Sequence, residues 1–364
     1  MRNAEQRRTL IEQPAFCRSD FRIPHSNFDM LSRVANSLYW MSRYIERAEN
    51  ISRMVDVNIQ LLLDFREVND AHMESHWLPI VQATGDDALF LKLYPRADSH
   101  SVCEFLTFSP GNPNSLVACI RAARENARVV RDQITIEMWE EINRLYLFLQ
   151  SGDARTMWQS NPSDFYYELK SVSLHFQGLA NATIPHMEGW RFMQAGKYLE
   201  RADKTSRILD IRHHTLPARG VPTATLGTRE ALEWAAVLRS CSAWDAYRQI
   251  HGVDIGPLRV AQLLLLDEDF PRSVEFCLLQ IDSALRGISG AQPGRFSNQP
   301  EKLSGRLAAE LRFSSIGEIF ERGLHDYIDA LQARFNEIGE TLFETYISHQ
   351  FEAAGMEIQQ QEQQ

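Results

Sequence analysis

Two short runs of acidic and basic residues are the strongest candidates for chemistry in this chain. We call them the charged rows: the first comprises Glu46, Glu49, Arg53 and Asp56, and the second comprises Glu200, Asp203, Arg207 and Asp210. On an α-helix, steps of three and four residues bring side chains to one face. Carboxylates gathered on one face can bind a metal ion or an amine, and arginines beside them can hold an anion.

The two charged rows belong to a longer repeat. Residues 44–57 read YIERAENISRMVDV, and residues 198–211 read YLERADKTSRILDI. Further along, Pro113-Asn114-Ser115 matches Pro271-Arg272-Ser273, and each triplet is followed at the same distance by a cysteine. Proline followed by serine is typical of a helix start. These matches predict an internal duplication.

The elements that carry the rows are expected to be helices. Apolar residues beside each row step by four and three, which is typical of a packed bundle helix, and strand patterns are nearly absent. We therefore predict an all-α fold, a helical bundle built from two tandem, duplicated halves. The expected parts are an N-terminal extension over residues 1–29 (disordered, or upstream of the true start), a first helical half over 30–160, a second over 161–350 and a polar tail over 351–364. The expected helices span 30–65, 77–93, 115–132, 134–150, 164–178, 186–214, 228–250, 258–266, 271–289 and 301–349, with a break in the last near residues 314–317.

Composition limits the class of protein. The formal net charge of −10 argues against a general nucleic-acid or anionic-membrane partner. No apolar run is long enough to span a bilayer, and the N-terminal stretch lacks the apolar middle of a secretory signal. The five cysteines are scattered singly, which favours reduced thiols in the cytoplasm. Cys119 and Cys277 share a repeat position, which favours core packing over catalysis.

Each row combines three acids with one arginine and lies between two largely apolar surfaces, so we expect it to be partly buried. Buried charge must be paired or coordinated. One source of cations is a basic stripe that contains Arg124 and Arg128. Two interpretations stay open: structural salt bridges within each half, or a polar site between the halves that binds a metal, an amine or an anion. The candidate residues for ion pairing or ligand binding are Glu46, Arg47, Glu49, Arg53, Glu200, Arg201, Asp203, Arg207, Arg124 and Arg128; no catalytic residue is assigned.

The sequence favours no metal or other cofactor. Carboxylate-bridged di-metal bundles need Glu-x-x-His on two helices, and neither row supplies that histidine. Mg²⁺, which prefers oxygen ligands, stays possible. His213 and His214 end the second charged helix, where histidine complements the helix dipole. Nucleotide-binding glycine loops and hydrolase elbows are missing from the sequence.

The string MLSRVANSLYWMSRYIERAEN over residues 30–50 closely resembles the opening of the bacterial Alpha-E family, domain of unknown function 403. Glu46-Arg47 and Glu200-Arg201 fit the Glu-Arg motif of that all-helical family, and the likeness extends over about 30–350. The resemblance implies an ATP-grasp-like partner, and a possible transglutaminase-like one, in a system that makes or modifies peptides or amide bonds. It implies no reaction for the helical protein itself.

Three functions follow as expectations. The first is an accessory subunit that binds the ATP-grasp partner or a charged peptide-like substrate. The second is an enzyme that acts on such a substrate, with Glu46, Glu200 and Arg124 or Arg128 in one cleft. The third is a structural scaffold. An open site where the rows converge would favour the enzyme, whereas rows sealed by arginines within each half would favour the scaffold.

Overall fold

A computed structural model describes residues 32–64, 70–213, 216, 220 and 227–348 of the chain. Over these residues the protein is helical and contains no strand, which confirms the predicted all-α class. The expected extension over 1–29 and the expected tail over 351–364 lie outside the described residues. Among the described helices, none is both long enough and apolar enough to cross a bilayer.

The described part of the chain forms sixteen α-helices and one short π-helix. The first eight are α1 (Ser32–Asp64), α2 (Asp70–Thr84), α3 (Asp87–Leu93), α4 (Ser99–Thr107), α5 (Leu116–Val129), α6 (Ile136–Gln150), α7 (Gly152–Ser160) and α8 (Pro162–Thr183). The others are α9 (Glu188–Asp210), α10 (Thr228–Ser240), α11 (Trp244–His251), α12 (Pro257–Leu266), α13 (Val274–Ser289), α14 (Gln299–Arg312), α15 (Ile316–Arg322) and α16 (Leu324–Phe343), followed by the short π-helix η2 (Glu344–Ser348).

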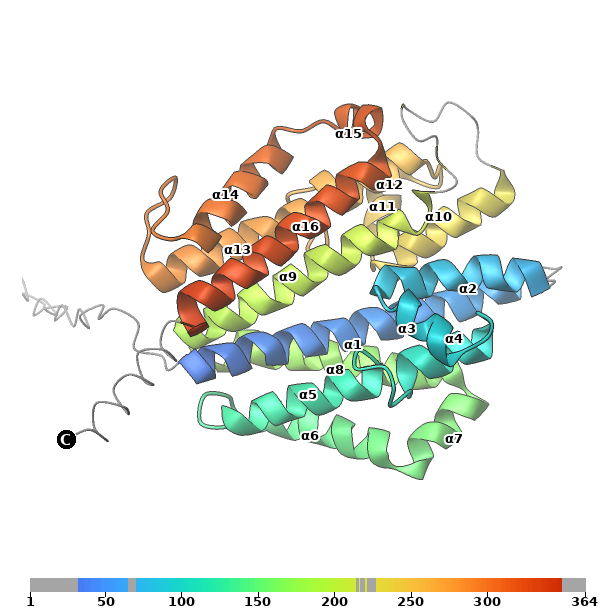
Figure 1. Cartoon of the computed structure of the whole chain (residues 1–364), viewed down its shortest axis with the longest axis horizontal. Coiled ribbons are helices and arrows are strands. Elements are labelled where there is room, and N and C mark those ends of the chain that lie inside the picture. Colours follow the sequence, from blue (N-terminus) through green and yellow to red (C-terminus); the bar gives the residue numbers. More distant parts are fainter. Residues whose placement is uncertain (1–31, 65–69, 214–215, 217–219, 221–226, 349–364) are drawn as a thin grey trace, which may run out of the picture.

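The two charged helices, α1 and α9, lie side by side at the centre of the molecule (Figure 1). Most positions of the predicted apolar lines are buried: Leu38, Met41, Ile45, Ala48, Ser52 and Val55 on α1, and Phe192, Ala195, Leu199, Ala202, Ser206 and Leu209 on α9. Val34, Ile59 and Leu62, toward the ends of α1, are only half-buried. This burial explains why the two helices form, since most helical stability in proteins comes from packing an apolar face.

A glycine lets the two central helices touch. Gly196 of α9 lies directly against the backbone carbonyl of Tyr39 on α1, where a Cβ atom would overlap the carbonyl oxygen. Further along, Glu46 of α1 meets Arg201 of α9. Contacts therefore advance in the same direction on both helices, so α1 and α9 run parallel.

Other helices cover the central pair on both sides. Helices α5 and α8 pack on α1, and α13 and α16 pack on α9. In addition, α10 reaches across to α1, and α2 reaches across to α9. Helix α8, which we predicted to begin the second half, packs on α1, α6 and α7. The core is therefore continuous around the two charged helices.

The predicted helix starts at the Pro-x-Ser triplets are confirmed. The Ser115 side chain accepts a hydrogen bond from the Ala118 N–H and caps α5, and Ser273 does the same for α13 through the Phe276 N–H. Cys119 and Cys277, one turn into these helices, are fully buried. Their predicted role in core packing is confirmed.

Some boundaries differ from the prediction. The expected helix over 77–93 is two helices, α2 and α3, separated at Gly85, whose φ of +80° stops a helix. The expected helix over 228–250 is likewise divided, into α10 and α11, around Ser242 with a φ of 53°. Helices α4 and α7 were not predicted. Asp98 starts α4 through a capping box with Ser101, a polar signal that hydrophobic periodicity does not register.

Candidate functional site

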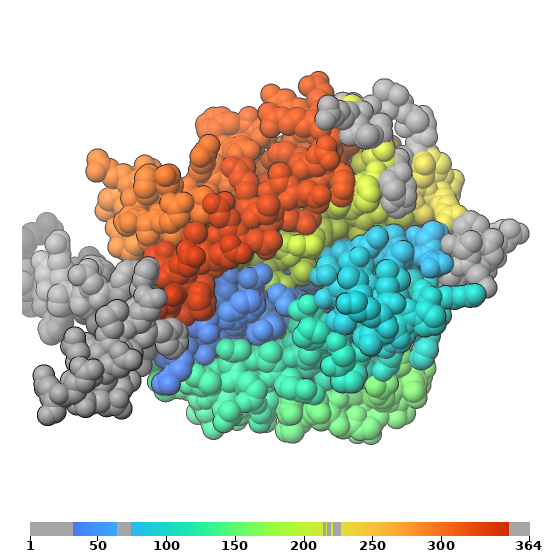
Figure 2. Space-filling model, viewed as in Figure 1, coloured from blue at the N-terminus to red at the C-terminus, as the bar shows by residue number. Residues whose placement is uncertain are grey.

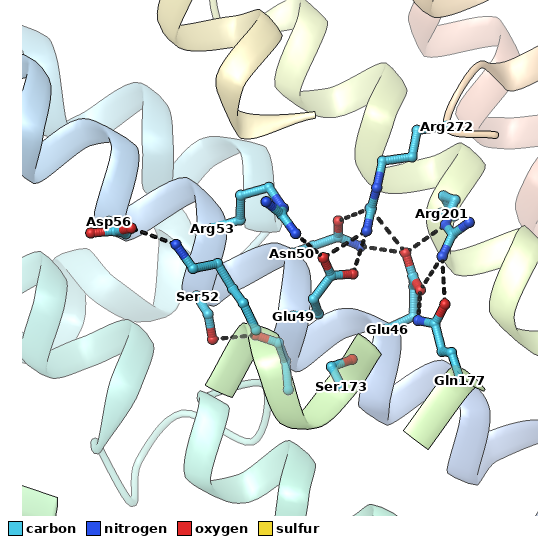
Figure 3. A network of polar contacts seen from close by, with 12 residues as sticks. Glu46, Glu49, Asn50, Ser52, Arg53, Asp56, Ser173, Gln177, Arg201 and Arg272 are labelled. Atoms are coloured by element: carbon cyan, nitrogen blue, oxygen red, sulfur yellow. Dashed lines mark hydrogen bonds and ion pairs between the residues drawn. The ribbon is translucent and has the colours of Figure 1, made fainter. Parts of the chain in front are cut away.

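The Glu46 carboxylate, from the middle of α1, is held by groups from three other segments. Arg201 of α9 donates from Nε and Nη2 at 2.7 and 2.8 Å, which is a two-pronged ion pair. Arg272, which precedes α13, donates from Nη1 at 3.2 Å, and Gln177 of α8 donates from Nε2 at 2.8 Å. Figure 3 shows these groups converging on a side chain that is 0% exposed.

The reverse pairing holds Glu200 of α9. Arg47 of α1 donates to it from Nε at 2.6 Å and from Nη2 at 3.0 Å, and Arg43 donates from Nε at 2.8 Å. The Glu200 side chain is also 0% exposed. We call Glu46–Arg201 and Glu200–Arg47 the crossed pairs, because each Glu-Arg dipeptide supplies the acid of one pair and the arginine of the other.

The second acid of each row is paired as well. Arg272 donates from Nη2 to both oxygens of Glu49, at 2.6 and 2.5 Å. Asp203 pairs with Lys204 at 3.1 Å. The helical pairs expected four residues apart are also present, since Arg53 donates to Glu49 and Arg207 donates to Asp203.

These neighbours set the pKa values of the buried acids. Burial alone would raise the pKa of Glu200, but the charges of Arg47 and Arg43 outweigh it and hold that pKa well below its ordinary value. Burial likewise works against ionisation of Glu49, yet Arg272 and then Arg53 lower its pKa to about 2. Both carboxylates are therefore ionised at neutral pH, and both need their cations.

The basic stripe does not supply those cations, which corrects the expectation for Arg124 and Arg128. Arg124 donates to Asn143 of α6 at 2.8 Å and pairs with Glu125 on its own helix, and Arg128 pairs with the same glutamate. The reason is the orientation of α5. Its buried face, which includes Cys119, is turned inward, so the arginines lie toward α6 and solvent. They do not form one cleft with Glu46 and Glu200.

Sequence reasoning missed Arg43, Arg272 and Gln177 as members of the site. Arg272 was visible in the repeat, but its counterpart in the first triplet is the neutral Asn114, so the alignment gave no signal of a charge. Asn114 instead accepts from Arg47 Nη1 at 2.6 Å. Arg43 lies one turn before the first Glu-Arg dipeptide, where the second copy has Lys197.

Among the described residues, a cavity lies beside Gln177 and Lys197 at the edge of the crossed pairs. It measures about 10 Å³, enough for one water molecule at most and too small for a substrate. A larger groove of about 380 Å³ begins at the outer edge of the site, between α1 and α16. It is lined by Tyr39, Trp40, Arg43, Phe335, Asn336, Gly339, Glu340, Phe343 and Glu344. In Figure 2 the blue surface of α1 meets the red surface of α16 in this region.

The arrangement defines a class of protein: an all-helical bundle whose two central, parallel helices exchange buried Glu–Arg pairs. The chain belongs to the Alpha-E family, described as "a predicted alpha-helical domain with a conserved ER motif", and the match covers residues 30–347. The resemblance expected from the sequence is confirmed. The two ER dipeptides of this chain, Glu46-Arg47 and Glu200-Arg201, supply the residues of the crossed pairs.

The relatives that match this chain are longer proteins without an assigned function. Uncharacterized proteins of Mycobacterium bovis and of two strains of Mycobacterium tuberculosis are each 28% identical to this chain over 328 residues. The alignments cover 84% of this chain and 34% of each relative. The chain thus spans about a third of the length of these curated relatives. No solved structure matches it.

Proposed function

We propose that this protein is a non-catalytic accessory subunit of a system that forms or modifies amide bonds, and that an ATP-grasp-type protein in the cytoplasm is its partner. A transglutaminase-like protein is a candidate second partner. The family resemblance supplies the partner class, and the chemistry of activation would belong to the partner.

The state of the crossed pairs is the observation that carries the proposal. Glu46 and Glu200 are 0% exposed, and each accepts several charge-assisted hydrogen bonds from arginines of the other central helix. A general acid or base must reach its substrate and exchange a proton. Carboxylates that are enclosed and hydrogen-bonded by guanidinium groups favour a structural contact between helices over a reacting centre. This argues against the alternative of an enzyme built on a Glu/Arg cleft.

The relatives are long enough to contain a partner protein fused to the helical domain. About two thirds of each mycobacterial relative lies outside the aligned region. The helical domain there shares its chain with other sequence, as fusion to a further protein would require. The third alternative, a purely structural helical scaffold, does not by itself require this additional sequence.

The groove between α1 and α16 is our proposed site for a charged peptide-like substrate or substrate tail. Arg43 lines the groove from α1, and Glu340 and Glu344 line it from the α16 side, together with the aromatic side chains of Trp40 and Phe343. The two glutamates would attract an amine of the ligand, the aromatic side chains would pack on its apolar parts, and Arg43, which also pairs with Glu200, would contact a carboxylate.

Co-expression with an ATP-grasp-type protein from the same organism tests the proposal. We expect the two chains to purify as one complex and the ligase activity to rise when the helical chain is present. Independent elution together with unchanged ligase activity would refute it.

A pair of variants then tests the groove. Phe343→Glu places a charge in the groove at a side chain that is 45% exposed, so the fold should tolerate it. We expect it to raise the substrate KM of the complex. Phe313→Glu is the control, because Phe313 is 86% exposed and does not line the groove. Equal KM values for the two variants would remove the groove from the proposal.

We also propose that the molecule arose by duplication, with the halves meeting after α8 instead of at residue 160. The packing of α5 and α8 on α1 parallels that of α13 and α16 on α9, which supports this division. Asp56 of α1 pairs with Lys170 of α8, and the aligned Asp210 of α9 pairs with His325 of α16. A solved structure in which the two sets of helices fail to superpose would count against the duplication.

A further inference from the structure

A cluster of metal-ligating side chains lies outside the crossed pairs, where α9 ends and α16 begins. Asp210 is the last residue of α9, His213 follows three positions later, and His325 is the second residue of α16. Each of these three residues offers one ligand atom, and the three atoms lie within 4.8 Å of one another. The two imidazole rings are stacked, with centroids 4.3 Å apart.

The spacing of two of these atoms already suits a shared metal ion. His325 Nδ1 lies 3.0 and 2.9 Å from the two carboxylate oxygens of Asp210. Metal–nitrogen and metal–oxygen bonds of about 2.0–2.2 Å, meeting at an angle between a right angle and the tetrahedral angle, place the two donor atoms roughly 2.9–3.5 Å apart. An ion could therefore replace the proton between His325 and Asp210 without moving the helices.

One nitrogen of each ring lies near an oxygen atom. His213 Nδ1 lies 2.9 Å from the backbone carbonyl of Asp210 and 3.8 Å from Asp210 Oδ1. A carbonyl oxygen only accepts, so Nδ1 carries the proton and the lone pair of the neutral ring is on Nε2. His325 Nε2 lies 3.7 Å from Asp329 Oδ2, so a negative charge lies near this ring, although the distance exceeds that of the hydrogen bond found behind zinc-bound histidines.

The first half of the chain provides an internal comparison. There the aligned aspartate, Asp56, pairs with Lys170 of α8 at 2.6 Å, which is an ordinary salt bridge. Ile59 takes the place of His213 in the alignment. The α1–α8 contact in the first half thus includes an ammonium–carboxylate pair at this position and no imidazole at residue 59. Two imidazoles are therefore not required for packing at this position.

The cluster opens onto a cavity of about 170 Å³ that is lined by Arg207, Asp210, His213, Asp329 and Gln332 together with α2 residues Pro79, Gln82 and Ala83. The side chains of His213 and His325 are 43% and 45% exposed, so an ion can enter from solvent. Arg207 brings a positive charge to the same cavity, which suits a small anion bound beside the ion.

We propose that Asp210, His213 and His325 bind one divalent transition-metal ion of the Zn²⁺ or Ni²⁺ type, with its remaining positions open to this cavity. Two imidazoles and one carboxylate form a donor set that suits these ions better than Mg²⁺ or Ca²⁺. The bound ion joins the end of α9 to the start of α16. The inference does not depend on the proposed accessory role.

Titration of the full-length, tag-free and chelator-treated protein with Zn²⁺ and Ni²⁺ tests the site. By calorimetry we expect saturable binding of the metal to the wild type. In both His213→Gln and His325→Lys, one equivalent of that binding should weaken at least tenfold. The metal should also raise the Tm of the wild type and leave the Tm of the two variants unchanged.

His325→Lys is chosen because it reproduces the Asp56–Lys170 salt bridge of the first half, so its metal-free Tm should match that of the wild type. His213→Gln gives a second, independent variant that keeps the proposal testable if the lysine disturbs the fold. His175→Gln is the control, since His175 is 61% exposed and pairs with Glu141 elsewhere. Absence of saturable binding to the wild type, or binding that both cluster variants retain, would overturn the proposal.

Discussion

Replacing Glu200 with glutamine should loosen the contact between the two central helices. The substitution keeps the size of the side chain but removes the charge that pairs with Arg47 and Arg43. Those two guanidinium groups are only 15% and 17% exposed, so water cannot take over the role of the lost carboxylate. The variant therefore leaves two largely buried positive charges without their acid.

Breaking a buried ion pair by removing one partner costs about 3–5 kcal/mol. Glutamine retains one acceptor oxygen, which places the expected loss near the lower end. With an unfolding entropy of about 2.1 cal/mol/K per residue, a chain of roughly 300 ordered residues that loses about 3 kcal/mol should lose about 5 °C in Tm. The free energy of unfolding at pH 7 is measured by urea titration and Tm by calorimetry.

The matched control is Glu125→Gln. Glu125 accepts from Arg124 at 2.8 Å and from Arg128 at 3.0 Å, but it is 47% exposed. Removing an exposed pair should cost at most about 1 kcal/mol. Adding Arg47→Met to Glu200→Gln removes one stranded cation and should recover about 1 kcal/mol or more. Equal losses for Glu200→Gln and Glu125→Gln would show that the crossed pairs do not hold the central helices together.

Three further predictions follow from the same contacts. The pKa of Glu49 is about 2 in the fold against an ordinary 4.5, so the stability that this carboxylate contributes is complete above pH 4.5 and is lost as pH falls toward 2. Acid unfolding followed by circular dichroism should therefore begin between these pH values, and an unchanged transition in Glu49→Gln would contradict this. Gly196→Ala should destabilise by about 1–3 kcal/mol because its Cβ would overlap the α1 backbone, whereas Gly178→Ala, with open space around it, should stabilise by about 0.5–1 kcal/mol; urea titrations that give both the same sign would refute the close contact. Burial raises the pKa of Cys119 and Cys277 to about 12, so both thiols should resist alkylation at pH 8 until the protein is unfolded, as peptide mass spectrometry would report.

The central helices could be predicted from the sequence because their signals are local. Residues such as Leu38 and Leu199 recur with the helical period and are buried as expected. Ser115 and Ser273 carry the chemistry of a helix cap in their own side chains, and both caps are present. Burial of the charged rows also followed from the apolar residues on either side of them.

The partners of the charged rows could not be predicted, because they depend on how distant helices meet. Arg272 precedes a helix far along the chain, and only the fold brings it to Glu46 and Glu49. Arg124 has the right spacing for a partner, but the packing of α5 turns it toward α6. Spacing along one helix reports which residues share a face, and it does not report what that face meets.

The crossed pairs admit a single alignment of α1 against α9. Sliding one helix by a turn, about 5.4 Å, would separate Arg47 from Glu200 and Arg201 from Glu46, and would break both pairs inside a buried interface. An interface made only of apolar side chains would tolerate such a shift in register far better. The outer helices pack on this central pair. A fixed alignment of α1 and α9 therefore also fixes the distance between the groove and the histidine cluster.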